Sequence, residues 1–272
     1  MQYIKVILPA AEQSERDMLM ALLSDMGYSG FEDTDDALLA FIEEPSFDRE
    51  ALSAAPVIEA TGFNTEVIPA QNWNALWESN FQPVVVDDFC TLRAHFHDID
   101  VTTPYDIVIT PKMSFGTGHH ATTRLMITLM RGLDFKGKRV LDFGTGTGVL
   151  AILAEKLGAA DVLAIDNDEW PVENTIENAA RNNCTHIRAQ LASLEDIETD
   201  HVGVLLANIN RHILLQHMEA MYETVAAGGH LLLSGILRED RAAILQAATN
   251  AGFKYVDARE EGDWLAMHFN KP

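Results

Sequence analysis

The order of strand-like and helix-like hydrophobic periodicity differs between two regions of the chain. Over residues 1–69, short stretches with period-two alternation are separated by two stretches of helical period, in the order βαββαβ. This order is that of a ferredoxin-like fold, so we expect a small α+β domain over these residues. The expected strands are 3–8, 29–34, 37–44 and 63–68, and the expected helices are 14–28 and 48–55.

From residue 138 onward, strands and helices alternate regularly, which predicts a doubly wound, Rossmann-like parallel sheet of the α/β class. The chain ends in two alternating stretches around an acidic turn, within residues 253–269, and this pattern predicts an antiparallel hairpin at the sheet edge. Strands are expected at 139–143, 161–166, 187–192, 202–208 and 230–235, and helices at 149–158, 171–183, 211–227 and 238–252.

The segment between these regions divides the chain into three parts. Residues 70–83 predict a connecting helix that ends at Pro83, in which Trp73 and Trp77 lie four apart and are expected to pack between domains. We therefore expect a ferredoxin-like domain at 1–69, a connector at 70–83 and the larger domain at 84–272.

The charge of the chain excludes some partners. The 272 residues carry a net charge of −22, with a pI of about 4.6, which repels nucleic acid and anionic membranes. Residues 1–56 hold twelve acids against three bases, either for solubility or to attract a basic protein. Because Cys90 and Cys184 are isolated and the N-terminus does not resemble a signal peptide, we expect a cytoplasmic protein. We expect it to be a monomer, and the negative charge indicates that it binds neither nucleic acid nor membrane.

The tetrapeptide FGTG occurs twice, and the second copy carries the clearer chemistry. Gly144, Gly146 and Gly148 lie directly after a strand and before a helix, where glycines let the backbone approach a ligand. The next strand ends in Asp166, whose carboxylate could accept both hydroxyls of a ribose. Asp142, just before the glycines, could accept from a cofactor ammonium. The alternatives are a structural turn and a helix cap, but the combined order predicts an adenosine-containing cofactor.

Two further features narrow the cofactor and the substrate. The G-x-G-x-G spacing and the C-terminal hairpin favour S-adenosylmethionine, and a class I methyltransferase, over a nicotinamide and a dehydrogenase. Asn208 ends the next strand at the same face, where it could bind the cofactor, cap the following helix, or do both. The tetrad NINR differs from the NPPY type that acts on planar amide or base nitrogens.

The first FGTG copy, from Phe115, follows no strand-to-helix turn of its own. Its glycines predict a lid-like loop that runs into a helix with Thr122 or Thr123 near its start. Because nothing else around the two copies matches, they are not a repeat.

These segments together resemble the PrmA family, the methyltransferases of ribosomal protein L11. The resemblance lies in "MSFGTGHHATT", "VLDFGTGTGVLAILAEKLGA", "AIDNDEWPVENTIENAARN", "ANI" and "GGHLLLSGIL", and it covers roughly residues 70–240. It implies a small N-terminal domain that binds the ribosomal protein and an S-adenosylmethionine-dependent domain. His119 and Ala121 depart from the usual F-G-T-G-T-H-P-T-T. The implied cofactor contacts are Thr123, Gly144, Asp166 and Asn208, and the further candidates are Phe115, Gly116, Thr122, Asp142 and Gly146.

The family reaction is methyl transfer to lysine ε-amino and N-terminal α-amino groups, which must first lose a proton. His119 and His120 are the candidate general bases. His95 and His97 share a strand face, but no partner carboxylate is set by the sequence, so we expect no metal. Two alternatives stay open: a methyltransferase that acts on another protein or a small molecule, and a binding module without activity.

Overall fold

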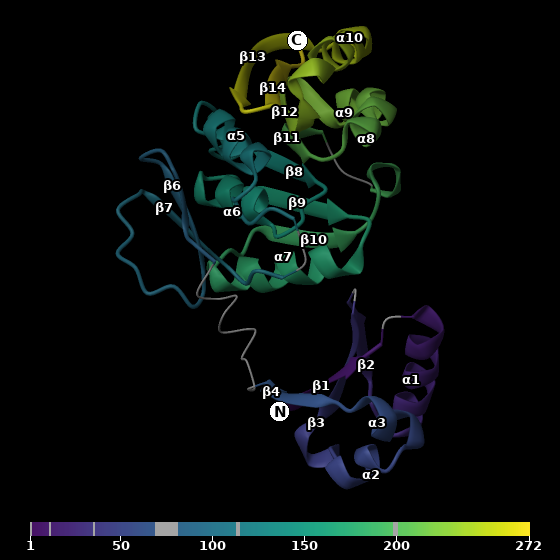
Figure 1. Ribbon diagram of the computed structural model, residues 1–272. Helices are drawn as coiled ribbons and strands as arrows, with labels where there is room; N and C mark the ends of the chain where they lie inside the picture. Colours follow the sequence, from purple (N-terminus) through teal and green to yellow (C-terminus); the bar gives the residue numbers. More distant parts are fainter. Residues whose placement is uncertain (1, 11, 35, 69–80, 113–114, 198–200) are drawn as a thin grey trace. The chain divides into compact units, whose positions relative to one another are not determined.

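The computed structural model describes residues 2–10, 12–34, 36–68, 81–112, 115–197 and 201–272 (Figure 1). The chain forms two compact units, Met1–Asn80 and Phe81–Pro272, and their division falls inside the expected connector at 70–83. The predicted connecting helix, with Trp73 and Trp77, lies outside the described residues except for its last three positions. Each unit is therefore considered by itself.

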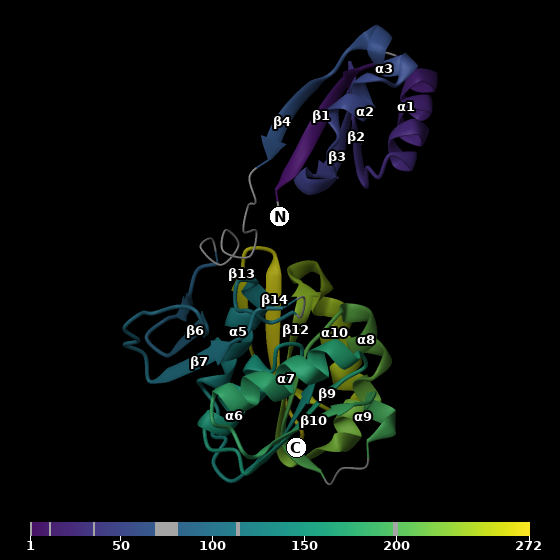
Figure 2. The ribbon, with the colours of Figure 1, turned by 90° about the horizontal axis from the view of Figure 1, so that it is seen from below.

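The N-terminal unit confirms the ferredoxin-like prediction. Its four strands pair in the order β2-β3-β1-β4, and all three pairings are antiparallel. The helices lie on one face of the sheet (Figure 2), where Leu19 and Leu23 of α1 pack in one core with Val6 and Leu38. The predicted second helix is α2, and Pro56 begins a third helix that the sequence pattern did not predict. The elements are β1 (Tyr3–Pro9), α1 (Gln13–Asp25), β2 (Gly30–Asp33), β3 (Ala37–Glu43), η1 (Glu44–Ser46), α2 (Arg49–Ser53), α3 (Pro56–Thr61) and β4 (Asn64–Ile68).

The larger unit contains the predicted doubly wound sheet. Seven strands pair in the order β10-β9-β8-β11-β12-β14-β13, and all neighbours are parallel except those of β14. The predicted antiparallel hairpin, β13 and β14, lies at this edge of the sheet, where β14 pairs with β12 and β13 is the outermost strand. The strands are β8 (Arg139–Phe143), β9 (Asp161–Asp166), β10 (Ile187–Leu191), β11 (Val202–Asn208), β12 (Val225–Leu237), β13 (Lys254–Glu261) and β14 (Trp264–Asn270).

Helices cover both faces of this sheet (Figure 1). One face carries α5, α6 and α7, and the other carries α8, α9 and α10. The helices are α5 (Ala121–Met130), α6 (Val149–Lys156), α7 (Glu169–Arg181), α8 (Arg211–Gln216), α9 (Met218–Thr224) and α10 (Arg241–Ala251), and short 3₁₀ turns lie at η2 (Leu194–Asp196) and η3 (Arg238–Asp240).

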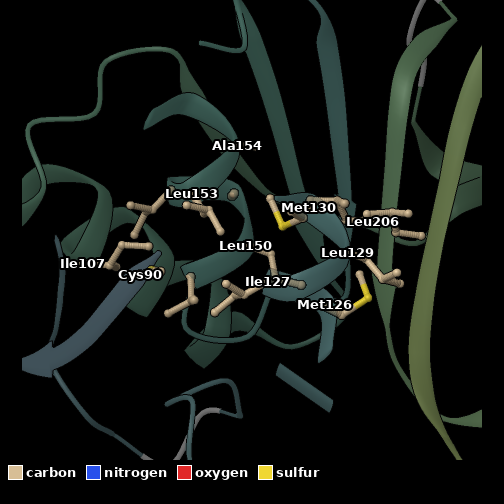
Figure 3. Close-up of a cluster of buried hydrophobic side chains, with 14 of the residues drawn as sticks. Cys90, Ile107, Met126, Ile127, Leu129, Met130, Leu150, Leu153, Ala154 and Leu206 are labelled. Atoms are coloured by element: carbon tan, nitrogen blue, oxygen red, sulfur yellow. The ribbon is translucent and has the colours of Figure 1, made fainter. Parts of the chain in front are cut away.

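A second, three-stranded sheet extends the core of this unit. Its strands β5 (Val84–Val86), β6 (Cys90–Ala94) and β7 (Tyr105–Ile109) pair in chain order. Figure 3 shows Cys90 and Ile107 of this sheet among side chains of α5 and α6, with Leu206 of β11 beyond them. Burial raises the pKa of the Cys90 thiol to about 12, which keeps it a neutral core residue.

The predicted helix over 211–227 is instead two helices, α8 and α9, and β12 begins at Val225. The break falls at His217, whose Nδ1 lies 2.7 Å from a Glu195 carboxylate oxygen and whose ring stands edge-on to Phe143. These tertiary contacts hold the His217 ring in place. The hydrophobic periodicity of the sequence does not reveal them, and by itself it predicts one continuous helix.

Among the described residues, no helix is long and apolar enough to cross a membrane. Over the same residues, no group of three or more His, Cys, Asp or Glu side chains could hold a metal ion.

Candidate active site

A cavity of about 620 Å³ lies at the carboxyl ends of β8, β9 and β11, where open α/β sheets bind ligands. Seven of the predicted site residues line this cavity: Phe115, His120, Thr122, Gly144, Gly146, Asp166 and Asn208. Its other lining residues are Phe143, Asn167, Asp168, Pro171, Ser193, Ile209, Asn210, Ile213, His217, Gly235 and Trp264.

Three positions of the turn after β8 require glycine. Gly144, Gly146 and Gly148 all have positive φ, between 58° and 79°. A Cβ on Gly146 would lie 2.3 Å from the carbonyl oxygen of Phe115, and one on Gly144 would lie 2.2 Å from the Ile209 side chain. The turn therefore presents bare backbone to the cavity.

Asp166 occupies the rim of the cavity at the end of β9. Backbone N–H groups of Gly146 and Asp168 donate to its two carboxylate oxygens, at 3.2 and 3.3 Å. Partial burial raises its pKa from the usual value, while these N–H groups oppose the rise. The carboxylate is thus held in place while its remaining lone pairs stay available to a ligand.

Asn208 lines the cavity beside the turn. Its Oδ1 atom is buried and has no hydrogen-bond partner within the described part of the chain. The cap position of α8 belongs to Asn210 and not to Asn208, so the capping alternative does not apply. A buried acceptor without a donor is costly, and a bound ligand that donates a hydrogen bond would remove that cost.

The two FGTG segments contact each other directly. The backbone N–H of Thr147, the residue directly after the second copy, donates to the Phe115 carbonyl at 2.9 Å. The hydroxyl of the same threonine donates to the Gly116 carbonyl at 2.8 Å. The first segment is therefore fixed against the glycine turn at Phe115 and Gly116, and Gly116 itself stands outside the cavity lining.

His120 caps helix α5 from inside the cavity. Its Nδ1 accepts from the backbone N–H of Thr122 at 3.3 Å and lies 2.8 Å from the Thr122 hydroxyl. In the neutral ring the proton is then on Nε2. The ring lies 4.4 Å from that of Trp264 and 5.2 Å from that of Phe115, measured between centroids. Thr123, one position further along the helix, is buried outside the lining, with its hydroxyl unpartnered among the described residues.

His119 is exposed and does not line the cavity. Its ring stands edge-on to Phe81, with centroids 4.6 Å apart, and its Nδ1 is 3.1 Å from the Thr117 hydroxyl. Arg124 secures this part of the loop, because it donates to the Gly118 carbonyl at 2.9 Å and pairs with Glu261 at the end of β13. The second departure, Ala121, is the first residue of α5, a position at which proline and alanine both fit.

Asp142 lies beneath the turn and not on the cavity wall. One of its oxygens accepts from the Thr145 hydroxyl at 2.9 Å, and the other has no partner in the described residues. Burial raises its pKa to about 7, so near neutral pH the group is partly protonated.

Replacing Asp142 with asparagine should make the stability of the chain less sensitive to pH. The folded pKa of Asp142 lies above its unfolded value, so its contribution is fully present below about pH 4. That contribution is lost as pH rises toward 7. The free energy of unfolding of Asp142→Asn relative to wild type should therefore increase from pH 4 to 7 and then level off, as measured by urea titration. Asp100→Asn, at an exposed site, serves as the control and should show no such trend.

Sequence reasoning overlooked Trp264, which follows the acidic turn and begins β14. The available signal was a tryptophan at the start of a strand that is otherwise buried. Because β14 lies next to β12, the start of this strand reaches the cavity beside His120.

Three features define a class I S-adenosylmethionine-dependent methyltransferase. They are the sheet order with the antiparallel strand β14 second from the edge, the glycine turn after β8, and Asp166 at the end of β9. The chain belongs to the family described as ribosomal protein L11 methyltransferase (PrmA), whose sequence profile matches residues 12–272. The resemblance found in the sequence is thereby confirmed.

Individual relatives agree with this assignment. The ribosomal protein L11 methyltransferase of Porphyromonas gingivalis is 39% identical over 262 residues, which span 93% of this chain and 90% of the relative. That of Chlorobaculum tepidum is 38% identical over 92% of this chain and 90% of the relative. The crystal structure of ribosomal protein L11 methylase from Lactobacillus delbrueckii subsp. bulgaricus superimposes with a TM-score of 0.66 at 27% identity, covering 70% of this chain and 99% of that one.

Proposed function

We propose that this chain transfers methyl groups from S-adenosylmethionine to lysine ε-amino and N-terminal α-amino groups of ribosomal protein L11. The observation that carries the cofactor is the pair of acceptors in the cavity, the fixed Asp166 carboxylate and the unpartnered Asn208 Oδ1. A cofactor with a ribose and an ammonium supplies donors for both. The names of the relatives support the protein substrate.

The residues of the cavity fit S-adenosylmethionine. Asp166 would accept hydrogen bonds from the ribose hydroxyls, and Asn208 would accept one from a donor such as the ammonium. The glycine turn, which has no side chains at these positions, would let the cofactor lie close to the protein backbone. When bound, the cofactor supplies a methyl group on a positively charged sulfur. Thr123 and Gly116 do not line the cavity, and we propose that they act by supporting Thr122 and Phe115, their neighbours in the chain.

The substrate amine would enter past aromatic side chains. Phe115, His120 and Trp264 line the cavity together, and the faces of the Phe115 and Trp264 rings attract an ammonium. The amine reacts only after it has lost its proton, because an ammonium has no lone pair. The contribution of these side chains is to align the nitrogen.

Of the two candidate bases, only His120 lines the cavity. We propose that it positions the amine, since its Nδ1 lone pair is used by the Thr122 N–H and its Nε2 carries the proton. His120→Asn keeps a capping side chain but cannot titrate. Its kcat should fall about tenfold or less, with the pH–rate profile unchanged. Loss of one limb of that profile would instead identify His120 as the base.

We propose that the acidic N-terminal unit recognises the basic substrate protein. This unit has its own core, so the large unit should fold without it. A variant lacking residues 1–69 should keep its affinity for S-adenosylmethionine, while its kcat/KM for ribosomal protein L11 falls about hundredfold or more. Equal kcat/KM in the two proteins would contradict this role.

The substrate is best tested by mass spectrometry of purified ribosomal proteins incubated with this chain and isotope-labelled S-adenosylmethionine. We expect label on lysines and the N-terminus of L11 alone; label on other proteins only would refute the proposal.

We further propose that the chain acts as a cytoplasmic monomer without direct nucleic acid contact, in line with its net charge of −22.

A further inference from the structure

Helix α7 and its C-cap residue carry three buried asparagines on one face. Asn174, Asn178 and Asn182 follow one another at intervals of four residues, and their exposed fractions are 0%, 0% and 8%. Residues at this spacing lie above one another along a helix. Three buried amides in a row need hydrogen-bond partners, because an unpaired buried amide is costly.

The partners of these amides are backbone groups of β7 and of Thr110 just beyond it, although the Oδ1 of Asn174 has none among the described residues. Asn182 forms a pair of bonds with Val108, accepting from its N–H at 2.9 Å and donating to its carbonyl at 2.7 Å. Asn178 accepts from the Thr110 N–H at 2.7 Å, and Asn174 donates to the Thr110 carbonyl at 3.2 Å. The asparagines thus bind backbone groups at a sheet edge that pairs with no other strand of the described structure.

Of the three asparagines, Asn178 is the one that the described structure shows bonded to the cofactor side as well. Its Nδ2 donates to the carbonyl of Thr147 at 2.8 Å, within the glycine turn. The N–H and hydroxyl of Thr147 hold Phe115 and Gly116, which follow Thr110 along the chain. Hydrogen bonds of Asn178 and Thr147 thus link α7, the glycine turn and the first FGTG segment, and Asn178 also binds Thr110, which precedes that segment in the chain.

We propose that Asn178 is a positioning residue that couples the cofactor turn to the stem of the first FGTG segment at Thr110. This inference rests on the proposed binding of S-adenosylmethionine. A ligand that orders the turn strengthens the bond from Asn178 to Thr147, and the same rigid amide then holds the Thr110 N–H. Thr110 precedes this segment in the chain, and Phe115 of the segment lines the cavity.

Asn182 is the matched control for this role. It has the same side chain, the same helix face and the same kind of bond to β7, but none of its hydrogen bonds reaches the glycine turn in the described structure. If the asparagines served only to fix β7 on α7, Asn178 and Asn182 would respond alike to the cofactor. If Asn178 couples the two segments, it alone responds.

The first test uses the unaltered chain and residue-resolved hydrogen exchange by NMR. Saturating S-adenosylmethionine should slow exchange of the Thr110 amide about tenfold, and leave the Val108 amide within about twofold. Equal slowing of both amides, or slowing of neither in a chain that binds the cofactor, overturns the coupling.

The second test compares Asn178→Leu with Asn182→Leu by calorimetry. Both variants should lower the melting temperature, whereas only Asn178→Leu should raise the Kd for S-adenosylmethionine, by about tenfold. Equal Kd values in the two variants contradict the proposal. If Asn178→Leu fails to fold, the exchange experiment decides. A wild-type chain that does not bind S-adenosylmethionine refutes the proposed function itself, and with it this inference.

Discussion

Replacing Asp166 with alanine should raise the Kd for S-adenosylmethionine at least about hundredfold. Each hydrogen bond from a ribose hydroxyl to a charged carboxylate contributes roughly 1.5–3 kcal/mol, and Asp166 can accept two. About 2.7 kcal/mol already corresponds to a hundredfold change in Kd. Titration calorimetry of the purified chain measures this directly.

The control for that experiment lies on the same strand. Asp161 begins β9 at the end away from the cavity and pairs with Arg188 at 3.1 Å. Asp161→Ala should therefore bind the cofactor as wild type does. Because the Asp166 carboxylate also receives the Gly146 N–H, circular dichroism should verify that Asp166→Ala is folded. A Kd within about threefold of wild type in a folded variant would refute the ribose assignment.

Strand ends explain why Asp166 and Asn208 could be predicted from the sequence. Parallel strands place their carboxyl ends at one edge, so a polar residue at such an end faces a common site. The same rule suggested Asp142, but this residue precedes Phe143, the last residue of β8, and is buried beneath the turn. A shift of one residue along a strand moves a side chain to the other face, and periodicity alone does not fix where the strand stops.

Residues brought together by tertiary pairing could not be found in this way. Trp264 reaches the cavity because β14 inserts between β12 and β13, and the sequence pattern placed the hairpin at the sheet edge without showing which of its strands pairs with β12. The sequence also could not show which of the adjacent residues His119 and His120 lines the cavity. The N-cap of α5 directs His120 into the cavity, while His119 turns toward Phe81.

The contact between the two FGTG segments predicts a large effect at Gly146. Gly146→Ala would place a Cβ 2.3 Å from the Phe115 carbonyl oxygen, at a φ of +58°. The left-handed backbone costs roughly 1–2 kcal/mol for a residue with a Cβ, and the steric overlap adds roughly 1–3 kcal/mol. We expect the free energy of unfolding to fall by about 2–5 kcal/mol, measured by urea titration.

Gly137→Ala separates the two causes of this loss. Gly137 has a φ of +71°, but a Cβ there meets no atom within 4 Å. Its alanine variant should lose only the roughly 1–2 kcal/mol of backbone strain and should bind S-adenosylmethionine normally. Gly146→Ala should in addition weaken cofactor binding, because a carbonyl pushed away from the turn takes Phe115 with it and moves the N–H that holds Asp166. Equal losses in the two variants would mean that the first FGTG segment yields freely, and that its contact with the glycine turn does not shape the cofactor site.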